Sequence, residues 1–595
     1  MLQPRIRIAI AAAFVSLIAA GSVAAQKISE DQLRDDVKYL ASDALEGRRA
    51  ATPANLKAAE FLAERFRAVG LRNAPGLQNY FHRFSYTTGV ELGDRTQLLL
   101  LNANGVRPLQ LGTEYNPMGF SSVGSVQGDL VFVGYGITNP EAKHDDYAGV
   151  NVNGKIAVAM RYGPDGNNPH SSFAEHMSFM AKVRAARSHG ATALIVINQP
   201  NEEQKLYPLM LERAGSNFGL PVLFATSPAF DDVRDPQEQP LKEVQLQIDS
   251  LKRPNSFPIS GWRADLNVDL RVNRDSIPNV IGVLPGTDPK LKDEVVVIGG
   301  HFDHLGWGGE GSLAHNHDSA IHHGADDNAS GTAGVLALAE YFAKKGGNRR
   351  TLVFCGFNAE EEGLLGSAAL VANFPYPIQN VVAMVNMDMI GRLDSNTLVM
   401  HGIGTSPEWE PMVKRLNRDR FTLKLVPDGF GPSDHSSFYA KDIPVLFYFT
   451  NLHKDYHRPS DTWEKVNYPG LKQIVELVAQ SVSAVDAMDQ RPAFTKAQAT
   501  QTPRSGSGFK VYVGTIPDYA FEGKGLRLSG VSDGGPAATA GLKGGDVIVK
   551  LGGKEIANIY DYTDALGQFK PKQEVEVEYL RGSATMTGKI VMGSR

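Results

Sequence analysis

The chain has 595 residues, which is too long for one hydrophobic core and predicts about three domains. Its formal net charge of −5 is small for this length, and no block of Lys or Arg supplies a basic face, so we expect no nucleic acid partner. The only cysteine, Cys355, cannot form an internal disulfide. Its place in the apolar run 351–357 favours a buried strand residue over a catalytic thiol.

Segment 1–25 has the features of a signal peptide. Arg5 and Arg7 precede an apolar run over 8–20, and small residues before Gln26 suit cleavage there. The run is short for a membrane span, which favours a cleaved signal over an uncleaved anchor. No other stretch approaches a transmembrane length. We therefore expect a periplasmic or secreted protein without stable membrane insertion.

Segment 27–111 begins with two predicted helices. Ser29 and Gln32 have the spacing of a capping box, in which each residue caps the other's backbone N–H. Thr52 is expected to cap the second helix, whose first turn holds Pro53. We interpret both as packing helices without a chemical role.

Segment 112–257 has a different texture, with short strands punctuated by glycines. The expected strands are 129–133, 155–160 and 193–197, with one helix over 179–189. No cluster of residues that commonly bind metals occurs here. The segment predicts a β-rich insert that does not carry the chemistry.

Segment 258–490 alternates buried strands with helices. We predict strands over 294–299, 351–357, 381–387 and 445–449, and helices over 330–345 and 471–488. Such alternation is typical of an α/β fold, with a mixed, mostly parallel central sheet flanked by helices.

The C-terminal part divides in two. Residues 491–507 are polar and low in bulky apolar side chains, which predicts a linker. Residues 508–595 contain short strands around the stretch GPAATAGLKGGDVI, enough for a small separate domain. We expect this tail to recruit substrates or partners and to be dispensable for chemistry.

Five residues of metal-binding type stand where apolar runs of the α/β segment end. Side chains at the carboxyl ends of parallel strands meet at one edge of a sheet, where ligands bind. One His, one carboxylate and a shared carboxylate for each ion form a suitable ligand set for two adjacent zinc ions. The five residues are His301, Asp327, Glu361, Asp388 and His457.

Their places in the sequence suggest roles. Asp327 precedes a predicted helix and suits the bridging position, with His301 and Asp388 on one metal and Glu361 and His457 on the other. Two neighbouring residues have further expected roles. Asp303 could orient the His301 imidazole. Glu360 remains free to act as general base.

Other motifs in this region are weaker. Residues 306–311 match G-x-G-x-x-G after a strand, but no amphipathic helix follows, which argues against a dinucleotide site. Five further histidines crowd the same loop, too many to be additional zinc ligands. We expect most to be loop residues or partners of the ligands, and their individual roles stay open: His304, His315, His317, His322 and His323.

These motifs resemble the co-catalytic di-zinc exopeptidase family that includes secreted bacterial leucyl aminopeptidases, glutamate carboxypeptidase and the transferrin receptor. The resemblance covers about 27–110 and 258–490. It implies the same five ligands with Asp327 bridging, and it implies Glu360 as the general base beside the acidic Asp303. Tyr456, next to the last ligand, matches a tyrosine with which some members stabilise the oxyanion.

The two remaining segments have resemblances of their own. Residues 112–257 are similar to the protease-associated (PA) domain often inserted in this family. Residues 508–595 resemble a PDZ domain of the bacterial protease type. In such domains the position of Tyr512–Thr515 holds a carboxylate-binding loop, which implies a peptide C-terminus as a further ligand.

The function we expect is an exported di-zinc aminopeptidase acting on peptides with a free N-terminus. A carboxypeptidase-type member with the same metals is the nearest alternative. A single-zinc enzyme of the glutaminyl-cyclase kind fits less well because all five ligands are present. A catalytically inactive binding protein of the transferrin-receptor kind is the alternative from another class.

Overall fold

The structure is a computed structural model. The predicted signal peptide 1–25 lies outside its described residues, as does most of the predicted linker 491–507. No helix in the described part of the chain is long and apolar enough to cross a membrane. The described residues are 27–139, 142–168, 171–207, 209, 219–309, 311–314, 320–497, 511–518, 521, 523–532 and 534–594.

The largest sheet is mixed, and its four central strands are parallel. The predicted α/β class is thereby confirmed, with antiparallel strands at the sides of the sheet. In order across the sheet the strands are β1 (Arg72–Asn73), β13 (Leu270–Leu284), β15 (Thr351–Phe357), β14 (Val295–His301), β16 (Val381–Met387), β19 (Val445–Phe449), β17 (Thr397–His401) and β18 (Thr422–Leu425), and β2 (Phe81–Leu92) pairs with β13.

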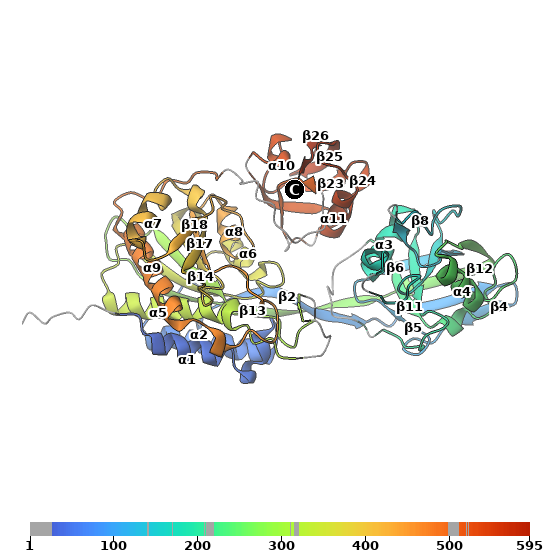
Figure 1. Ribbon diagram of the computed structural model, residues 1–595, viewed down its shortest axis with the longest axis horizontal. Coiled ribbons are helices and arrows are strands. Elements are labelled where there is room, and N and C mark those ends of the chain that lie inside the picture. Colours follow the sequence, from blue (N-terminus) through green and yellow to red (C-terminus); the bar gives the residue numbers. More distant parts are fainter. Residues whose placement is uncertain are drawn as a thin grey trace, which may run out of the picture.

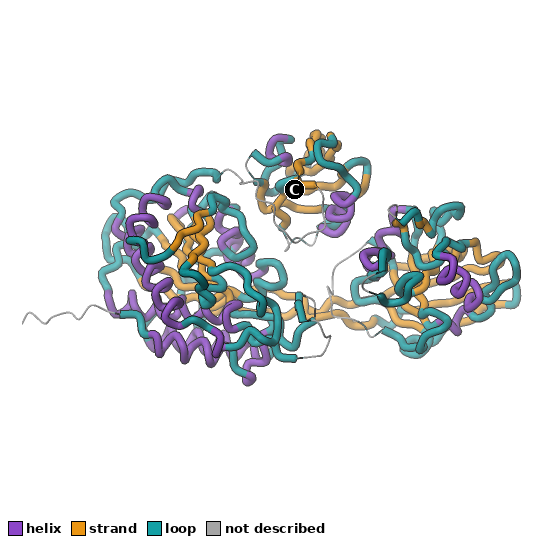
Figure 2. Tube along the Cα trace, in the orientation of Figure 1, coloured by secondary structure: helices purple, strands orange, loops and turns teal. Residues whose placement is uncertain are grey.

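Helices cover both faces of this sheet. Figure 2 shows them in purple around the orange strands. Successive side chains of β14 point to opposite faces, so Val296 and Ile298 join one core while Val295 and Val297 join the other. Cys355 of β15 is buried in the second core, as predicted. The helices on the first side are α1 (Glu30–Leu40), α2 (Pro53–Ala68), α5 (Gly331–Lys345), α7 (Trp409–Asn417) and α9 (Tyr468–Ala487), and on the second α6 (Leu365–Ala372) and α8 (His435–Tyr439).

The first two helices begin where the sequence predicts. Ser29 Oγ accepts the backbone N–H of Gln32 at 3.2 Å, but the Gln32 amide donates to Asp36 Oδ1 at 3.1 Å instead of closing the capping box. The reciprocal half of the predicted box is therefore absent. Thr52 caps α2 by accepting the N–H of Asn55 at 3.1 Å.

A second sheet of eight strands carries its own core. It takes strands from both sides of the predicted insert 112–257, because β3, β4 and β12 all pair within it. In order across the sheet the strands are β4 (Gly105–Pro108), β3 (Gln97–Asn102), β12 (Phe257–Val268), β6 (Gly124–Phe132), β9 (Ile156–Met160), β10 (Ala193–Ile197), β11 (Val222–Ala225) and β5 (Tyr115–Pro117), with helices α3 (Phe179–Ser188) and α4 (Leu241–Leu251) and the small pair β7 (Thr138–Asn139) and β8 (His144–Asp145).

A long antiparallel ribbon joins the two sheets. Strands β2 and β13 pair continuously from Phe81 with Val280 to Leu92 with Leu270, apart from one irregularity in register. Figure 1 shows the two strands running side by side from one sheet toward the other. The sequence analysis did not predict this ribbon.

The C-terminal residues form a small third unit with a separate core. Pairing of β20 with β27 brings the start of this unit to its end. In order across its main sheet the strands are β21 (Thr515–Pro517), β22 (Leu526–Val531), β23 (Val547–Leu551), β25 (Glu574–Arg581) and β26 (Ala584–Val591), with β24 (Lys554–Glu555), β20 (Val511–Tyr512), β27 (Gly593–Ser594) and helices α10 (Pro536–Thr539) and α11 (Ile559–Gly567).

Candidate metal centre

The five residues predicted as ligands meet at the carboxyl ends of the central parallel strands. His301 is the last residue of β14, and Asp388 comes directly after β16. Asp327 lies in the turn before α5, Glu361 follows β15, and His457 follows β19. Because these strands are parallel, their ends lie at one edge, and side chains far apart in sequence converge there.

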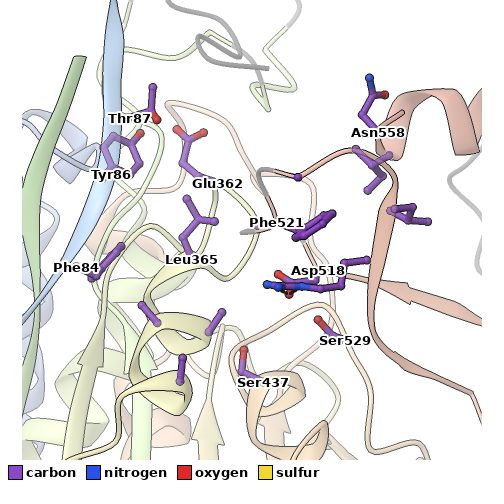
Figure 3. A pocket seen from close by; sticks show the side chains of 18 of the residues that line it. Phe84, Tyr86, Thr87, Glu362, Leu365, Ser437, Asp518, Phe521, Ser529 and Asn558 are labelled. Atoms are coloured by element: carbon purple, nitrogen blue, oxygen red, sulfur yellow. Dashed lines mark hydrogen bonds and ion pairs between the residues drawn. The ribbon is translucent and has the colours of Figure 1, made fainter. Parts of the chain in front are cut away.

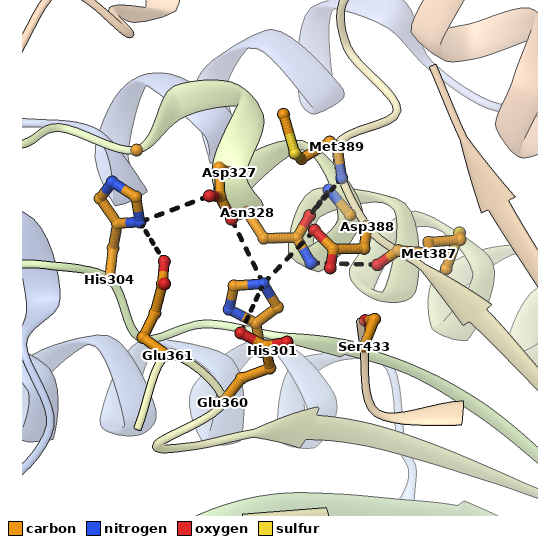
Figure 4. A network of polar contacts seen from close by, with 12 residues as sticks. His301, His304, Asp327, Asn328, Glu360, Glu361, Met387, Asp388, Met389 and Ser433 are labelled. Atoms are coloured by element: carbon orange, nitrogen blue, oxygen red, sulfur yellow. Dashed lines mark hydrogen bonds and ion pairs between the residues drawn. The ribbon is translucent and has the colours of Figure 1, made fainter. Parts of the chain in front are cut away.

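A first cluster forms around His301 (Figure 4). Its Nε2 atom lies 3.4 Å from Asp327 Oδ1 and 3.4 Å from Asp388 Oδ1. Glu360 Oε2 lies 3.8 Å from the same nitrogen. These separations leave one imidazole nitrogen facing three carboxylates.

A second cluster forms on the other side of Asp327. His457 Nε2 lies 3.2 Å from Asp327 Oδ2 and 3.2 Å from Glu361 Oε2. His304 Nδ1 lies 2.6 Å from Glu361 Oε1 and 3.9 Å from Asp327 Oδ2. The two oxygens of Asp327 therefore face two different groups of ligand-type atoms.

The polar atoms at the first cluster suit a cation. His301 Nε2 and Asp388 Oδ1 are buried, and neither has a hydrogen-bond partner among the described residues. A buried polar atom without a partner is costly, and a bound ion removes that cost. Ligand-type atoms within 4.8 Å of one another occur in two groups, one of His301, Asp327 and Asp388 and one of His304, Asp327 and Glu361. Imidazole nitrogen and carboxylate oxygen are both common zinc ligands.

Asp303 supports the site differently from the prediction. The closest acceptor for His301 Nδ1 is the backbone carbonyl of Asp303 at 3.2 Å, whereas the Asp303 carboxylate is 3.8 Å away. That carboxylate accepts the backbone N–H groups of Glu360 at 3.1 Å and Glu361 at 3.4 Å. Asp303 therefore fixes the loop that carries the predicted base as well as the imidazole.

Two further contacts hold ligands in place. The carbonyl oxygen of Gly311 accepts from His457 Nδ1 at 2.8 Å, which orients the imidazole so that Nε2 faces the cluster. Asp461 Oδ2 accepts the backbone N–H groups of Asp326 at 2.8 Å and Asp327 at 3.2 Å. The turn that presents Asp327 is thus fixed by a carboxylate from a distant part of segment 258–490.

Burial and neighbouring charges shift the pKa values in the site. Burial raises the pKa of Glu360 well above its usual range, and the nearby His301 opposes this only in part. Burial also acts to raise the pKa of Asp327, yet the neighbouring imidazoles of His301 and His457 hold it well below the usual range. Adjacent carboxylates therefore prefer different protonation states, a pattern typical of functional sites.

Tyr456 lies against the second cluster. Its ring stacks on the His457 imidazole, with the ring centres 3.8 Å apart. Burial and the carboxylates of Asp327 and Glu361 raise the pKa of the Tyr456 hydroxyl. The phenol therefore stays protonated at neutral pH and keeps an O–H group that can donate.

Among the crowded histidines the structure singles out His304, which was left without a role. His322 instead contacts the Ser312 hydroxyl at 2.8 Å, and His323 contacts Asp43 Oδ1 at 2.8 Å. His315 and His317 lie outside the described residues. The signal for His304 was present in the sequence, because it lies only three residues after His301 in one motif.

Sequence reasoning also missed Arg48, a fully buried arginine. Its Nε donates to the Phe302 carbonyl at 2.8 Å and its Nη2 to the Gly324 carbonyl at 3.0 Å. Arg48 thereby ties together the two chain segments that lead to His304 and to Asp327. A single arginine in a turn carries no sequence signal for such a role.

A mixed α/β sheet that gathers imidazoles and carboxylates at one edge defines a metal-binding domain of the α/β class. Residues 279–482 match the sequence model of peptidase family M28, residues 126–232 match the PA domain, and residues 504–591 match the PDZ domain. The predicted resemblance is confirmed: three segments of the chain match an M28 peptidase, a PA domain and a PDZ domain.

Individual relatives agree with these matches. A probable leucine aminopeptidase of Arthroderma benhamiae is 29% identical over 213 residues, covering 34% of this chain and 56% of the relative. This chain thus spans about half the length of the fungal leucine aminopeptidases it matches. A glutamate carboxypeptidase 2 homolog of Caenorhabditis elegans is 24% identical over 540 residues, covering 76% of this chain and 65% of the relative.

Comparison with solved structures finds aminopeptidases among the similar chains. An aminopeptidase from Aneurinibacillus is 23% identical, covers 81% of this chain and 99% of its own, and superposes with a TM-score of 0.44. A zinc aminopeptidase from Bacillus subtilis is 21% identical, covers 77% and 95%, and has a TM-score of 0.46.

Proposed function

We propose that the chain is a zinc-dependent aminopeptidase that hydrolyses the N-terminal bond of peptides. The observation that carries the proposal is the placement of Asp327, whose Oδ1 faces His301 and whose Oδ2 faces His457. A carboxylate between two ligand groups can bridge metal ions about 3.5–4 Å apart. His301 and Asp388 would complete one zinc site and Glu361 and His457 the other, which gives two zinc ions per chain.

Zinc bound there would act as a Lewis acid, polarising the scissile carbonyl and activating a water molecule. Glu360 is the general base in this proposal. Its carboxylate takes a proton from the attacking water as the new C–O bond forms, and it returns that proton to the amine as the C–N bond breaks. Burial raises the pKa of Glu360, and a carboxylate with a raised pKa binds a proton more readily, which suits a group that takes one from water.

Tyr456 and Asp303 assist in different ways. The protonated Tyr456 hydroxyl is the donor that we assign to the negative charge developing on the carbonyl oxygen. Asp303 keeps Glu360 in position through its hydrogen bond to the Glu360 backbone N–H, at 3.1 Å. Tyr456 acts on the reacting atoms, whereas Asp303 acts through its neighbours.

The charges around the site favour binding of an amine over binding of a carboxylate. Arg392 is already neutralised by Asp455 at 3.3 Å and Asp461 at 2.7 Å. A carboxypeptidase needs a cation for the substrate's terminal carboxylate. Arg49, which lines the cavity beside the site and lies 3.5 Å from Glu362, is the cation that this alternative would use.

The deciding experiment compares end-blocked peptides. We expect acetylation of a peptide's N-terminus to abolish hydrolysis and amidation of its C-terminus to have little effect, with all activity lost on chelation and restored by zinc. If the acetylated peptide is cleaved and the peptide with an amidated C-terminus is not, the carboxypeptidase alternative is established. No hydrolysis of any peptide by zinc-loaded protein would favour a binding protein of this fold.

We further propose that the chain is exported by segment 1–25. The support is the sequence alone: basic residues, an apolar run and small residues before Gln26. Expression of the full gene in a Gram-negative host, with N-terminal sequencing of the protein in each fraction, tests this. A mature N-terminus at Gln26 outside the cytoplasm is expected, and an intact Met1 in the cytoplasm would contradict it.

A further inference from the structure

A large cavity adjoins the candidate metal centre and reaches the PDZ domain. Its volume is about 1830 Å³, and its inner wall includes Asp303, His304 and Glu361. Its opposite wall includes Asp518, Phe521 and other residues of the PDZ domain. Figure 3 shows Phe521 and Asp518 on one side of this space and Glu362 and Leu365 on the other. The PDZ domain and the catalytic site therefore share one cavity.

The cavity is larger than a single side chain requires. Sites for small molecules usually measure about 300–1,000 Å³. An extended peptide advances about 3.3 Å per residue, so a substrate whose first residue sits at the metal centre must run outward through this space. The part of the substrate beyond the scissile bond is thus brought toward the PDZ wall.

The PDZ wall offers a defined surface built from three side chains. The Arg527 guanidinium lies over the Phe521 ring, 4.5 Å from its centre. Arg527 Nε also donates to Asp518 Oδ2 at 2.7 Å. An aromatic ring fixed by a paired arginine gives apolar contact area, and the polar groups beside it can hydrogen-bond to a peptide backbone.

The PDZ domain is held in this place by both other domains. Arg187 of α3 in the PA domain donates from Nη1 to both carboxylate oxygens of Asp561 in α11, each at 2.7 Å. On the other side, Phe430 of the catalytic domain lies so close to Gly530 of β22 that a Cβ there would be 2.5 Å from the ring. Arg187 and Asp561, hereafter the latch, link the PA domain to the PDZ domain.

The loop that the sequence predicts to bind a carboxylate makes contacts within its own domain. Thr515 of β21 and Tyr562 of α11 contact each other through their hydroxyl groups at 2.7 Å. The carbonyls of Val513 and Gly514 accept hydrogen bonds from Ala537 and Ser532. These contacts tie the predicted carboxylate-binding loop to its own domain, whereas Phe521 lines the cavity.

We propose that the PDZ domain is the outer wall of the substrate cavity and binds the residues of the peptide substrate that follow the scissile bond. The chain accordingly selects oligopeptides over dipeptides and aminoacyl-arylamides. The latch keeps the wall in place. This inference rests on the proposed aminopeptidase function. It gives a location in the cavity to the tail that the sequence analysis expected to recruit substrates or partners and to be dispensable for chemistry.

The first test measures binding without turnover. Full-length Glu360→Gln protein, loaded with zinc, is titrated with an octapeptide and with a dipeptide that share the same free N-terminal residue. We expect the octapeptide to bind about tenfold more tightly. Adding Phe521→Ala should weaken octapeptide binding by about fivefold, a factor that corresponds to roughly 1 kcal/mol. Equal affinity for the two peptides, or no effect of Phe521→Ala, would overturn the inference.

The second test uses charge reversal at the latch in otherwise unaltered protein. Arg187→Glu should lower kcat/KM for the octapeptide by about fivefold and leave leucyl-arylamide hydrolysis unchanged. The double variant Arg187→Glu/Asp561→Lys restores an ion pair and should restore octapeptide turnover. Small-angle X-ray scattering should show expansion of Arg187→Glu and recovery in the double variant, a readout independent of activity.

The outcomes separate the inference from the function on which it rests. If Arg187→Glu changes neither arylamide hydrolysis nor the rate with the octapeptide, the inference about the PDZ domain is overturned. The proposed function then still stands. Absence of hydrolysis with every substrate would overturn the proposed function, and the binding titration would still decide whether the wall contacts a peptide.

Discussion

The largest sheet, hereafter the catalytic sheet, and the second sheet, hereafter the PA sheet, are both built around buried parallel strands. They differ in the residues that follow those strands. In both, parallel strands are buried on two faces, as in β14 and β16 of one and β9 and β10 of the other. The catalytic edge gathers imidazoles and carboxylates. The PA edge carries Asn198 and Gln199 after β10 and Arg161 after β9. The architecture alone therefore does not make a reaction site.

The two edges treat their polar groups differently. Gln199 at the PA edge donates to the Tyr135 hydroxyl at 3.2 Å and the Arg161 carbonyl at 3.3 Å. At the catalytic edge His301 Nε2 and Asp388 Oδ1 face each other at 3.4 Å without a hydrogen bond. Asn198 Oδ1 at the PA edge also has no hydrogen-bond partner among the described residues, but an amide oxygen is uncharged. Clustered carboxylates, by contrast, repel one another and are stabilised by a bound cation. The following substitutions test this difference.

The largest effect is expected from Asp327→Ala. Removing the shared carboxylate takes away a ligand from both clusters, so zinc content should fall from about two per chain to nearly none and activity should vanish. Elemental analysis of dialysed protein measures this. Asn198→Ala at the PA edge is the control and should keep both metal and activity. Retention of about two zinc ions by Asp327→Ala would refute the bridging role.

Glu360→Gln should separate chemistry from metal binding. Because the amide cannot shuttle a proton, kcat should fall by about 10²–10⁴-fold while zinc content stays that of the unaltered protein. Arylamide kinetics and elemental analysis on the same sample test both parts. Near-normal turnover would mean that another group is the base.

Tyr456→Phe should have a smaller effect than loss of the base. The phenyl ring keeps the stacking on His457 but loses the hydroxyl donor, so kcat should fall by about 10²-fold with zinc content unchanged. A rise in KM or a loss of metal, with kcat unchanged, would show that Tyr456 supports the His457 ligand and does not act on the oxyanion. Steady-state kinetics distinguishes the two results.

The smallest effect concerns stability in the PA domain. Burial lowers the pKa of Lys182 from 10.5 to about 7 in the folded chain. Between the two pKa values, Lys182 is protonated in the unfolded chain but not in the folded chain. The free energy of unfolding therefore increases as pH rises from about 7 to 10.5, and this stabilisation is lost as pH falls. The slope can reach about 1.4 kcal/mol per pH unit.

Lys182→Met should remove this slope. Amide hydrogen exchange in β9 and β10, measured across the window, reports the local stability of the PA sheet. The exposed Lys242 of α4 supplies the control, since Lys242→Met should leave the slope intact. An unchanged slope in Lys182→Met would assign the pH dependence to other groups. The Tyr162 carbonyl, which accepts from Lys182 Nζ at 2.6 Å, would lose a donor, so a uniform loss of stability is also expected.

Much of the catalytic domain follows from the sequence by itself. The four predicted central strands all form, and Thr52 caps α2 as expected. These features are local, because hydrophobic runs and capping residues act over a few neighbouring positions. The order of His301, Asp327, Glu361, Asp388 and His457 at strand ends indicated a metal site for the same reason, since parallel strands present their ends at one edge.

Other features were decided only by the tertiary structure. The contact of His304 with Glu361 joins residues 57 positions apart, and the bond from Arg48 to Gly324 joins residues 276 apart. The β2–β13 ribbon also escaped the sequence analysis, because much of it is partly exposed and lacks the long apolar run of a buried strand. The position of the PDZ domain over the cavity depends on single contacts between domains, such as Arg187 with Asp561. Periodicity within a segment fixes which face is buried, but it carries no information about which distant segment packs there.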